Sequence, residues 1–124
     1  MTENPRKILV IEDNDDLRTV LQDLLSLEGH ATSSTSNLAD ARKVLDSERF
    51  DIVIVDHWLE GEASDELVEH MSRAREAPSI IMCSAAPSMV DVANRFHVYH
   101  LAKPFELDEL LQLTETAAQH HRRP

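Results

Sequence analysis

The sequence is poor in several features that would indicate other protein classes. It has a single cysteine, Cys83, so a disulfide framework is excluded, and we expect the thiol to lie inert in the core of a cytoplasmic protein. Only two of the 124 residues are glycine, and the chain has neither a P-loop nor a glycine-rich dinucleotide fingerprint. A hydrolase or nucleotide-binding α/β enzyme is therefore disfavoured.

Long apolar runs and an excess of basic residues are also missing. No apolar stretch reaches the roughly 18 residues needed to span a bilayer, and no signal peptide pattern is present, so we expect a soluble protein with no membrane partner. The chain has 12 Lys and Arg against 23 Asp and Glu, a formal net charge of -11. This balance disfavours direct nucleic-acid binding, which depends on basic side chains that neutralise phosphates.

The length fits one domain, residues 1–124, that can bury a core without disulfides. We place that core at about residues 7–118 and expect residues 119–124, which end in a short basic stretch, to be a tail or linker stub.

Four short apolar runs are each followed by polar residues with useful chemistry. They are residues 8–11 before Glu12 and Asp13, residues 52–55 before Asp56, residues 80–83 before Ser84, and residues 98–102 before Lys103. β-Branched runs without alternation are typical of strands in a parallel sheet covered by helices on both faces. The carboxyl ends of such strands share one edge, where open α/β folds bind ligands. We therefore expect three carboxylates, a hydroxyl and an ammonium to meet in one crevice.

Helical spacing of apolar residues separates these runs. The clearest helix spans residues 14–28, with Asn14 as its N-cap and an apolar stripe of Leu17, Val20, Leu21, Leu24 and Leu25. The other expected elements are a weak strand at residues 30–34, helices at 37–47, 65–71, 87–95 and 107–118, and a loop at 57–63 that Trp58 anchors. Five strands alternating with five helices predict a doubly wound parallel α/β sheet in a three-layer sandwich.

The strand-end residues, followed by Lys103-Pro104-Phe105, resemble the receiver domain of two-component response regulators. The resemblance covers about Lys7 to Ala118 and implies a flavodoxin-like sheet of order 2-1-3-4-5. Each element alone has an ordinary explanation, since the Glu12-Asp13 pair also suits a helix N-terminus. Their combination favours a phosphoprotein of phosphorelay signal transduction, which is not an enzyme beyond its own phosphorylation and dephosphorylation.

The resemblance also implies roles for individual residues. Asp56 would become an aspartyl phosphate, taking its phosphoryl group from a histidine kinase or histidine phosphotransfer protein. Mg²⁺ would be bound by Asp13, Asp56 and the backbone carbonyl of Trp58, with Glu12 acting mainly through water. Ser84 and Lys103 would contact the phosphoryl group. The surface of the fourth helix, fifth strand and fifth helix would carry the switch and a candidate homodimer interface, whereas the effector stays unidentified.

Several positions depart from the family pattern. Glu60 stands where a proline is usual, and His100 stands where many receivers carry the switching Tyr or Phe, although an imidazole could take the same inward and outward positions. These departures support an alternative, a degenerate receiver that acts as a phosphorylation-independent interaction module. Trp58 and Ala86 flank the expected path of the hydrolytic water, and because neither can position a water well, we expect a long-lived phosphoryl group.

Overall fold

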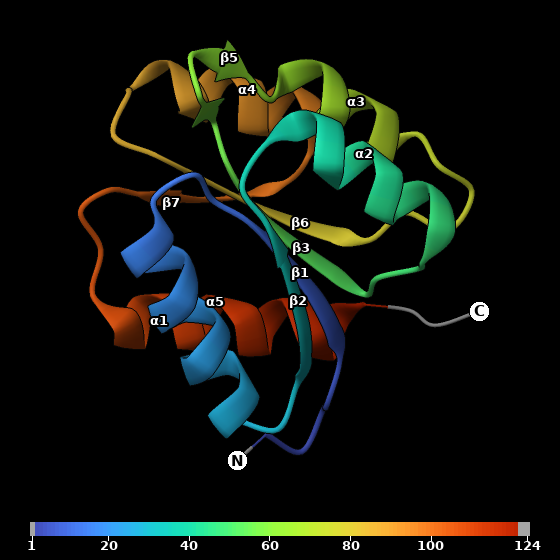
Figure 1. The fold of residues 1–124 in the computed structure, drawn as a ribbon, viewed down its shortest axis with the longest axis vertical. Coiled ribbons are helices and arrows are strands. Elements are labelled where there is room, and N and C mark those ends of the chain that lie inside the picture. Colours follow the sequence, from blue (N-terminus) through green and yellow to red (C-terminus); the bar gives the residue numbers. More distant parts are fainter. Residues whose placement is uncertain (1, 122–124) are drawn as a thin grey trace.

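The apolar runs form a parallel five-stranded sheet at the centre of the computed structural model, which describes residues 2–121 (Figure 1). The strand order is β2-β1-β3-β6-β7, so the predicted order 2-1-3-4-5 is confirmed. The strands are β1 (Lys7–Ile11), β2 (Ala31–Thr35), β3 (Ile52–Asp56), β6 (Ser79–Ser84) and β7 (Tyr99–Ala102).

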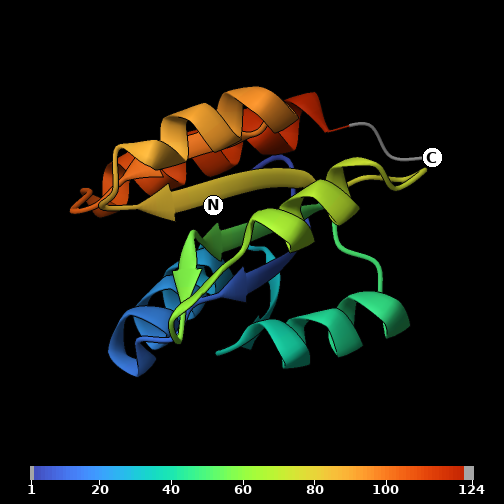
Figure 2. The ribbon, with the colours of Figure 1, turned by 90° about the horizontal axis from the view of Figure 1, so that it is seen from above.

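Five helices cover the two faces of this sheet, as predicted. They are α1 (Asp15–Leu27), α2 (Leu38–Ser47), α3 (Asp65–Ser72), α4 (Ser88–Phe96) and α5 (Leu107–His120). Helices α1 and α5 lie on one face, and α2, α3 and α4 lie side by side on the other (Figures 1 and 2). None of the helices within residues 2–121 is long and apolar enough to cross a membrane.

Alternation of side chains along the strands divides the core into two layers. Leu9, Val53 and Val55 belong to the layer under α2, α3 and α4, whereas Ile52 and Ile54 belong to the layer under α1 and α5. The second layer also contains Cys83, and its burial raises the pKa of the thiol to about 12. The thiol therefore stays protonated, as expected of an inert core residue.

The segment between β3 and α3 is more ordered than the sequence predicts. The expectation of an irregular loop over residues 57–63 was wrong, because a small antiparallel hairpin forms there from β4 (Trp58–Leu59) and β5 (Glu62–Ala63). Its tip residues Glu60 and Gly61 both have positive φ angles, 50° and 81°. Such a turn matches the twist of a hairpin, although a positive φ is uncommon for glutamate.

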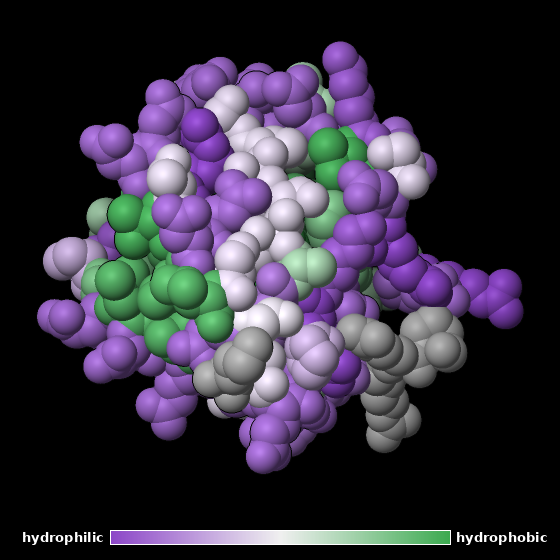
Figure 3. All heavy atoms as spheres, turned by 60° about the horizontal axis from the view of Figure 1, so that its bottom comes forward, coloured by the Kyte–Doolittle hydropathy of each residue, from purple (hydrophilic) through white to green (hydrophobic). Residues whose placement is uncertain are grey.

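Apolar side chains remain exposed on the face of α1 and α5. Figure 3 shows them gathered over α1 and the N-terminal half of α5. Val20, which we expected on the buried stripe of α1, is 45% exposed, and Leu107 at the start of α5 is 40% exposed. This apolar surface borders the carboxyl ends of the strands, because α1 begins shortly after β1 ends.

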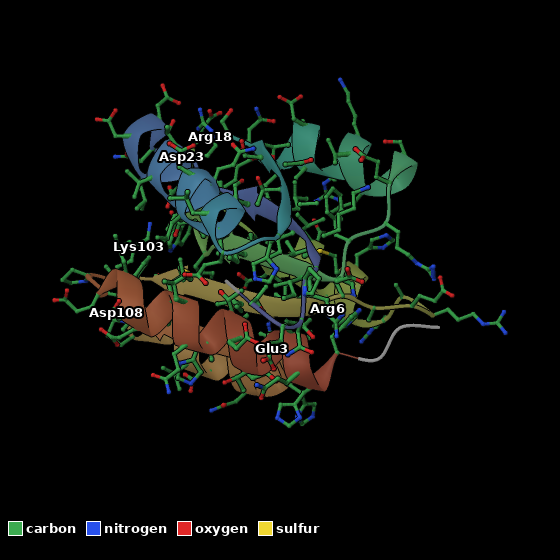
Figure 4. The ribbon with its side chains drawn as sticks, turned by 90° about the horizontal axis from the view of Figure 1, so that it is seen from below. Glu3, Arg6, Arg18, Asp23, Lys103 and Asp108 are labelled. Carbon is green, nitrogen blue, oxygen red and sulfur yellow. The ribbon has the colours of Figure 1, made fainter. Side chains whose placement is uncertain are left out.

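The N-terminal segment, which leads into β1, is tied to α5 (Figure 4). Thr2 and Asn4 donate hydrogen bonds to the carboxylate of Glu115, and the Arg6 guanidinium donates to the carbonyl of Ala118. Helix α5 continues through His120, two residues into the stretch that we expected to be a tail. Residues 122–124, which include Arg122 and Arg123 of the basic stretch, lie outside the described range.

His30 makes the stability of this region depend on pH. Its ring is buried beside β2, its Nδ1 atom accepts the backbone N–H of Arg6 at 3.0 Å, and burial lowers its pKa below the ordinary value of 6.5 despite the nearby Glu28 and Glu115 carboxylates. His30 therefore takes up a proton less readily in the folded protein than in the unfolded chain. The contribution of neutral His30 to the stability of the fold is therefore complete above the pKa that this histidine has in the unfolded chain. It is lost as the pH falls below that value.

We expect urea midpoints to fall between about pH 7.5 and about pH 5.5, and to fall less in His30→Gln, which keeps an acceptor oxygen for the Arg6 N–H. Unfolding curves of the two proteins at both pH values provide the measurement. An equal fall in both proteins would assign the pH dependence to other groups.

Candidate functional site

Three carboxylates meet where β1 and β3 end. Glu12 and Asp13 follow β1, and Asp56 is the last residue of β3, which pairs with β1. One oxygen atom from each of the three carboxylates lies within 4.8 Å of the others. Carboxylates at such distances repel one another by roughly 3 kcal/mol per pair at an effective dielectric constant of about 20. The arrangement therefore requires compensating positive charge.

Lys103 supplies part of that charge from the end of β7. Its Nζ atom donates hydrogen bonds to Glu12 Oε1 at 2.7 Å and to Asp56 Oδ2 at 3.0 Å. Figure 4 shows this lysine at the end of the sheet, between the starts of α1 and α5. Burial alone would lower the pKa of the ammonium, but its hydrogen bonds to Glu12 and Asp56 raise that pKa above the ordinary value. The ammonium is therefore held in its charged form.

Glu12 and Asp13 are adjacent but lie in different environments. Glu12 is only 4% exposed, and burial raises its pKa, although Lys103 and the backbone N–H of Asn14 act in the opposite direction. Asp13 is exposed, and the backbone N–H of Glu60 donates to its Oδ2 atom at 3.0 Å, which lowers its pKa. The hairpin tip thus holds Asp13 as a carboxylate. Sequence analysis did not identify this contact.

Ser84 lies at the end of the neighbouring strand β6. It is buried, its Oγ atom accepts the backbone N–H of Ala86 at 3.0 Å, and its carbonyl accepts the N–H of Lys103 at 2.9 Å. Within residues 2–121, no hydrogen bond joins its hydroxyl to the carboxylates. The hydroxyl proton can therefore be donated to a group that enters the crevice.

Sequence analysis named three other candidate residues. Trp58 is 51% exposed, so the expectation that it anchors the loop was wrong, and Leu59 is the buried residue of the hairpin. Ala86 is partly buried at the turn after β6. His100 is exposed on β7, whereas Tyr99 packs against the layer under α1 and α5, so these adjacent side chains point to opposite faces of the sheet. His100 therefore occupies an outward position.

The donor atoms of the cluster fit a hard divalent cation. Glu12, Asp13 and Asp56 offer only oxygen ligands, which Mg²⁺ prefers, and one ammonium cannot balance three carboxylates. A cation would therefore relieve the charge repulsion that Lys103 leaves.

His57 is a further residue that sequence analysis did not assign to the site. It lies in the stretch that we expected to be a loop, but its side chain is buried and its Nε2 atom lies 2.8 Å from Asp65 Oδ1. His57, which directly follows Asp56 in the chain, thus forms a polar pair with Asp65.

Comparisons with known proteins agree with this geometry. The model of the response regulator receiver domain family matches residues 8–115. The chain is 28% identical over 107 residues to the sporulation initiation phosphotransferase F of Bacillus subtilis, covering 84% of this chain and 86% of that protein. It is 30% identical over 120 residues to the DNA-binding transcriptional regulator NtrC of Azospirillum brasilense, covering 94% of this chain but only 25% of that protein. The solved receiver domain of NtrX from Brucella abortus aligns with a TM-score of 0.80 at 26% identity, covering 91% of this chain and 98% of that one.

Proposed function

The chain belongs to the response regulator receiver domain family, and on that premise we propose that Asp56 accepts a phosphoryl group from a phosphohistidine of a cytoplasmic sensor kinase or phosphotransfer protein. The observation that carries the proposal is the position of Lys103, whose ammonium joins Asp56 to Glu12 inside a cluster of three carboxylates. This arrangement supports the proposal because the carboxylate of Asp56 lies beside a fixed positive charge.

In this proposal each group of the cluster has a separate part. Asp56 Oδ2 is hydrogen-bonded to Lys103, so Oδ1 would form the bond to phosphorus while the phosphorus–nitrogen bond of the donor breaks and its electron pair returns to the imidazole. Lys103 and the hydroxyl of Ser84 would then contact the phosphoryl oxygens. Mg²⁺ held by Glu12, Asp13, Asp56 and the Trp58 carbonyl would supply further positive charge to those oxygens.

Two surfaces suit the protein partners of this reaction. The exposed apolar face of α1 and α5 borders the carboxylate cluster, so a helix of the phosphodonor could pack there while its histidine reaches Asp56 (Figure 3). The surface of α4, β7 and α5 would carry the response to an effector or to a second copy of the chain, and it includes His100 and the exposed Val90.

The alternative is a degenerate receiver that binds partners without phosphorylation. Its support from the sequence was the presence of Glu60 and His100 at unusual positions. However, the backbone N–H of Glu60 donates to Asp13 and so adds a contact to the cluster rather than disrupting it. This contact favours the phosphorylatable receiver.

Intact mass spectrometry after incubation with acetyl phosphate and Mg²⁺ tests the proposal. We expect a gain of about 80 Da, the mass of one phosphoryl group, and no gain when the metal is chelated. A chain that stays unmodified over a range of donor concentrations would instead support the alternative module.

The lifetime of the phosphoryl group should depend on Trp58. Its large apolar ring and single N–H group are poorly suited to orient a water molecule, and the nearby Ala86 side chain offers no polar atom. Replacing Trp58 by Asn should therefore raise the hydrolysis rate by about tenfold, equivalent to roughly 1.4 kcal/mol of barrier. Decay of the phosphorylated species after removal of the donor, at constant Mg²⁺, gives the rate. Equal or slower decay in the variant would show that Trp58 does not limit access of water.

A further inference from the structure

His57 and Asp56 are consecutive but face different layers. Asp56 faces the crevice, whereas His57 follows Val55 into the layer that α3 and α4 cover. The imidazole is buried there, with 4% of the residue exposed. Its Nε2 atom is 2.8 Å from Oδ1 of Asp65, the first residue of α3.

This side-chain contact closes the base of the hairpin together with two backbone hydrogen bonds. The N–H of Ser64 donates to the carbonyl of His57 at 2.8 Å, and the N–H of His57 donates to the carbonyl of Cys83 at 2.8 Å. The other carboxylate oxygen of Asp65 faces Arg95 of α4 at 3.9 Å. The base is thus attached to β6 and α3, and it faces α4.

The hairpin reaches from this base to the carboxylate cluster. Trp58 pairs with Ala63 as the strands leave the base, and the N–H of Glu60 at the tip donates to Asp13 at 3.0 Å. A change at the base would therefore move the backbone that contacts the cluster.

We propose that His57 and Asp65 form a clamp that positions the backbone of Trp58 and Glu60 at the carboxylate cluster and thereby raises its affinity for Mg²⁺. The proposal rests on the proposed function only in requiring that the cluster bind a divalent cation. Both residues are positioning residues, since they act through the hairpin.

Stability alone does not account for a polar pair at this place. The Nδ1 atom of His57 and the hydroxyl of Ser64 are buried and make no hydrogen bond to any other residue within 2–121. Buried polar groups without partners lower stability, and an apolar side chain of similar volume at position 57 would remove one of them. If the pair is purely structural, His57→Leu should lower the unfolding midpoint and leave Mg²⁺ binding unchanged. If the pair is a clamp, His57→Leu should weaken Mg²⁺ binding and keep or raise the midpoint.

Trp58 provides a direct readout of metal binding, because it is the only tryptophan and lies two residues after Asp56. Titration of its fluorescence with MgCl₂ should give a dissociation constant about tenfold higher in His57→Leu and Asp65→Ala than in the wild type. Asp65→Asn keeps an acceptor oxygen for the imidazole, so its dissociation constant should lie between those of the wild type and Asp65→Ala. Glu69→Gln, which removes an ion pair with Arg73 at the C-cap of α3, is the control and should bind like the wild type.

Two measurements without metal complete the test. His57→Leu should keep or raise the unfolding midpoint, and hydrogen exchange of the hairpin amides, residues 58–63, should be faster in Asp65→Ala than in Glu69→Gln. A lowered midpoint of His57→Leu with an unchanged dissociation constant would reduce the pair to a structural role and overturn the clamp.

The outcomes also separate the clamp from the proposed function. If the wild type can be phosphorylated and the variants bind Mg²⁺ as tightly as the wild type does, only the clamp is overturned. A wild type that binds Mg²⁺ but gains no phosphoryl group would overturn the proposed function, and the clamp would stand if the variants bind more weakly. If the wild type does not bind Mg²⁺, unchanged hairpin exchange in Asp65→Ala overturns the clamp, and faster exchange supports its positional part.

Discussion

Asp56→Asn should gain no phosphoryl group under conditions in which the wild type gains about 80 Da. An amide is not a nucleophile for this reaction, and neither remaining carboxylate combines a free oxygen with a hydrogen bond from Lys103. Both oxygens of Glu12 accept hydrogen bonds, from Lys103 and from the backbone of Asn14, and Asp13 accepts one from Glu60. Substitution of Asp56 should therefore remove the modification completely rather than redirect it.

Intact mass spectrometry with acetyl phosphate and Mg²⁺ measures the effect. Asp46→Asn, which makes the same chemical change on the exposed side of α2, is the matched control and should be modified like the wild type. A stoichiometric gain in Asp56→Asn would transfer the acceptor role to another residue.

Lys103→Met should destabilise the metal-free protein by about 2 kcal/mol, below the usual range for removing one partner of a buried ion pair because the lysine is partly exposed. The ammonium holds Glu12 and Asp56 together, and the side chains of these residues are 5% and 12% exposed. Without it, two largely buried carboxylates would face each other with no cation. Methionine keeps an unbranched side chain that is one atom shorter, and it removes the charge and the hydrogen bonds.

Urea unfolding in the presence of a chelator gives this difference. Burial raises the pKa of Glu12 in the folded state, and removal of Lys103 should raise it further, so the folded variant takes up a proton more readily than the unfolded chain. The destabilisation should therefore shrink as pH falls from about 7.5 to about 5.5, and Mg²⁺ should also reduce it. Lys43→Met on the exposed face of α2 is the control. Equal stability of Lys103→Met and the wild type would mean that the ammonium does not compensate the carboxylates.

The central cluster could be predicted because it follows from the sheet alone. Once residues 8–11 and 52–55 are assigned to parallel strands, Glu12, Asp13 and Asp56 must share one edge. The same reasoning placed Lys103 near them. No precise loop conformation was needed.

The hairpin could not be predicted, since its shape depends on a conformation that the residue type does not indicate. Gly61 suggests a turn, but nothing in the sequence indicates a positive φ at Glu60, which directs its N–H to Asp13. We expected Trp58 to anchor the loop. The observed alternation instead buries His57 and Leu59 and exposes Trp58, because the strand-like backbone continues beyond β3.

The two edges of the sheet have a consequence for self-association. Among residues 2–121, strand β2 pairs only with β1 and has the sequence ATSST, and β7 pairs only with β6 and has four residues that include the exposed His100. Short polar edges are poor templates for the strand of another molecule, and a net charge of -11 adds electrostatic repulsion between copies. The protein is therefore protected from edge-to-edge aggregation at high concentration, and the surfaces it leaves for specific recognition are mainly helical.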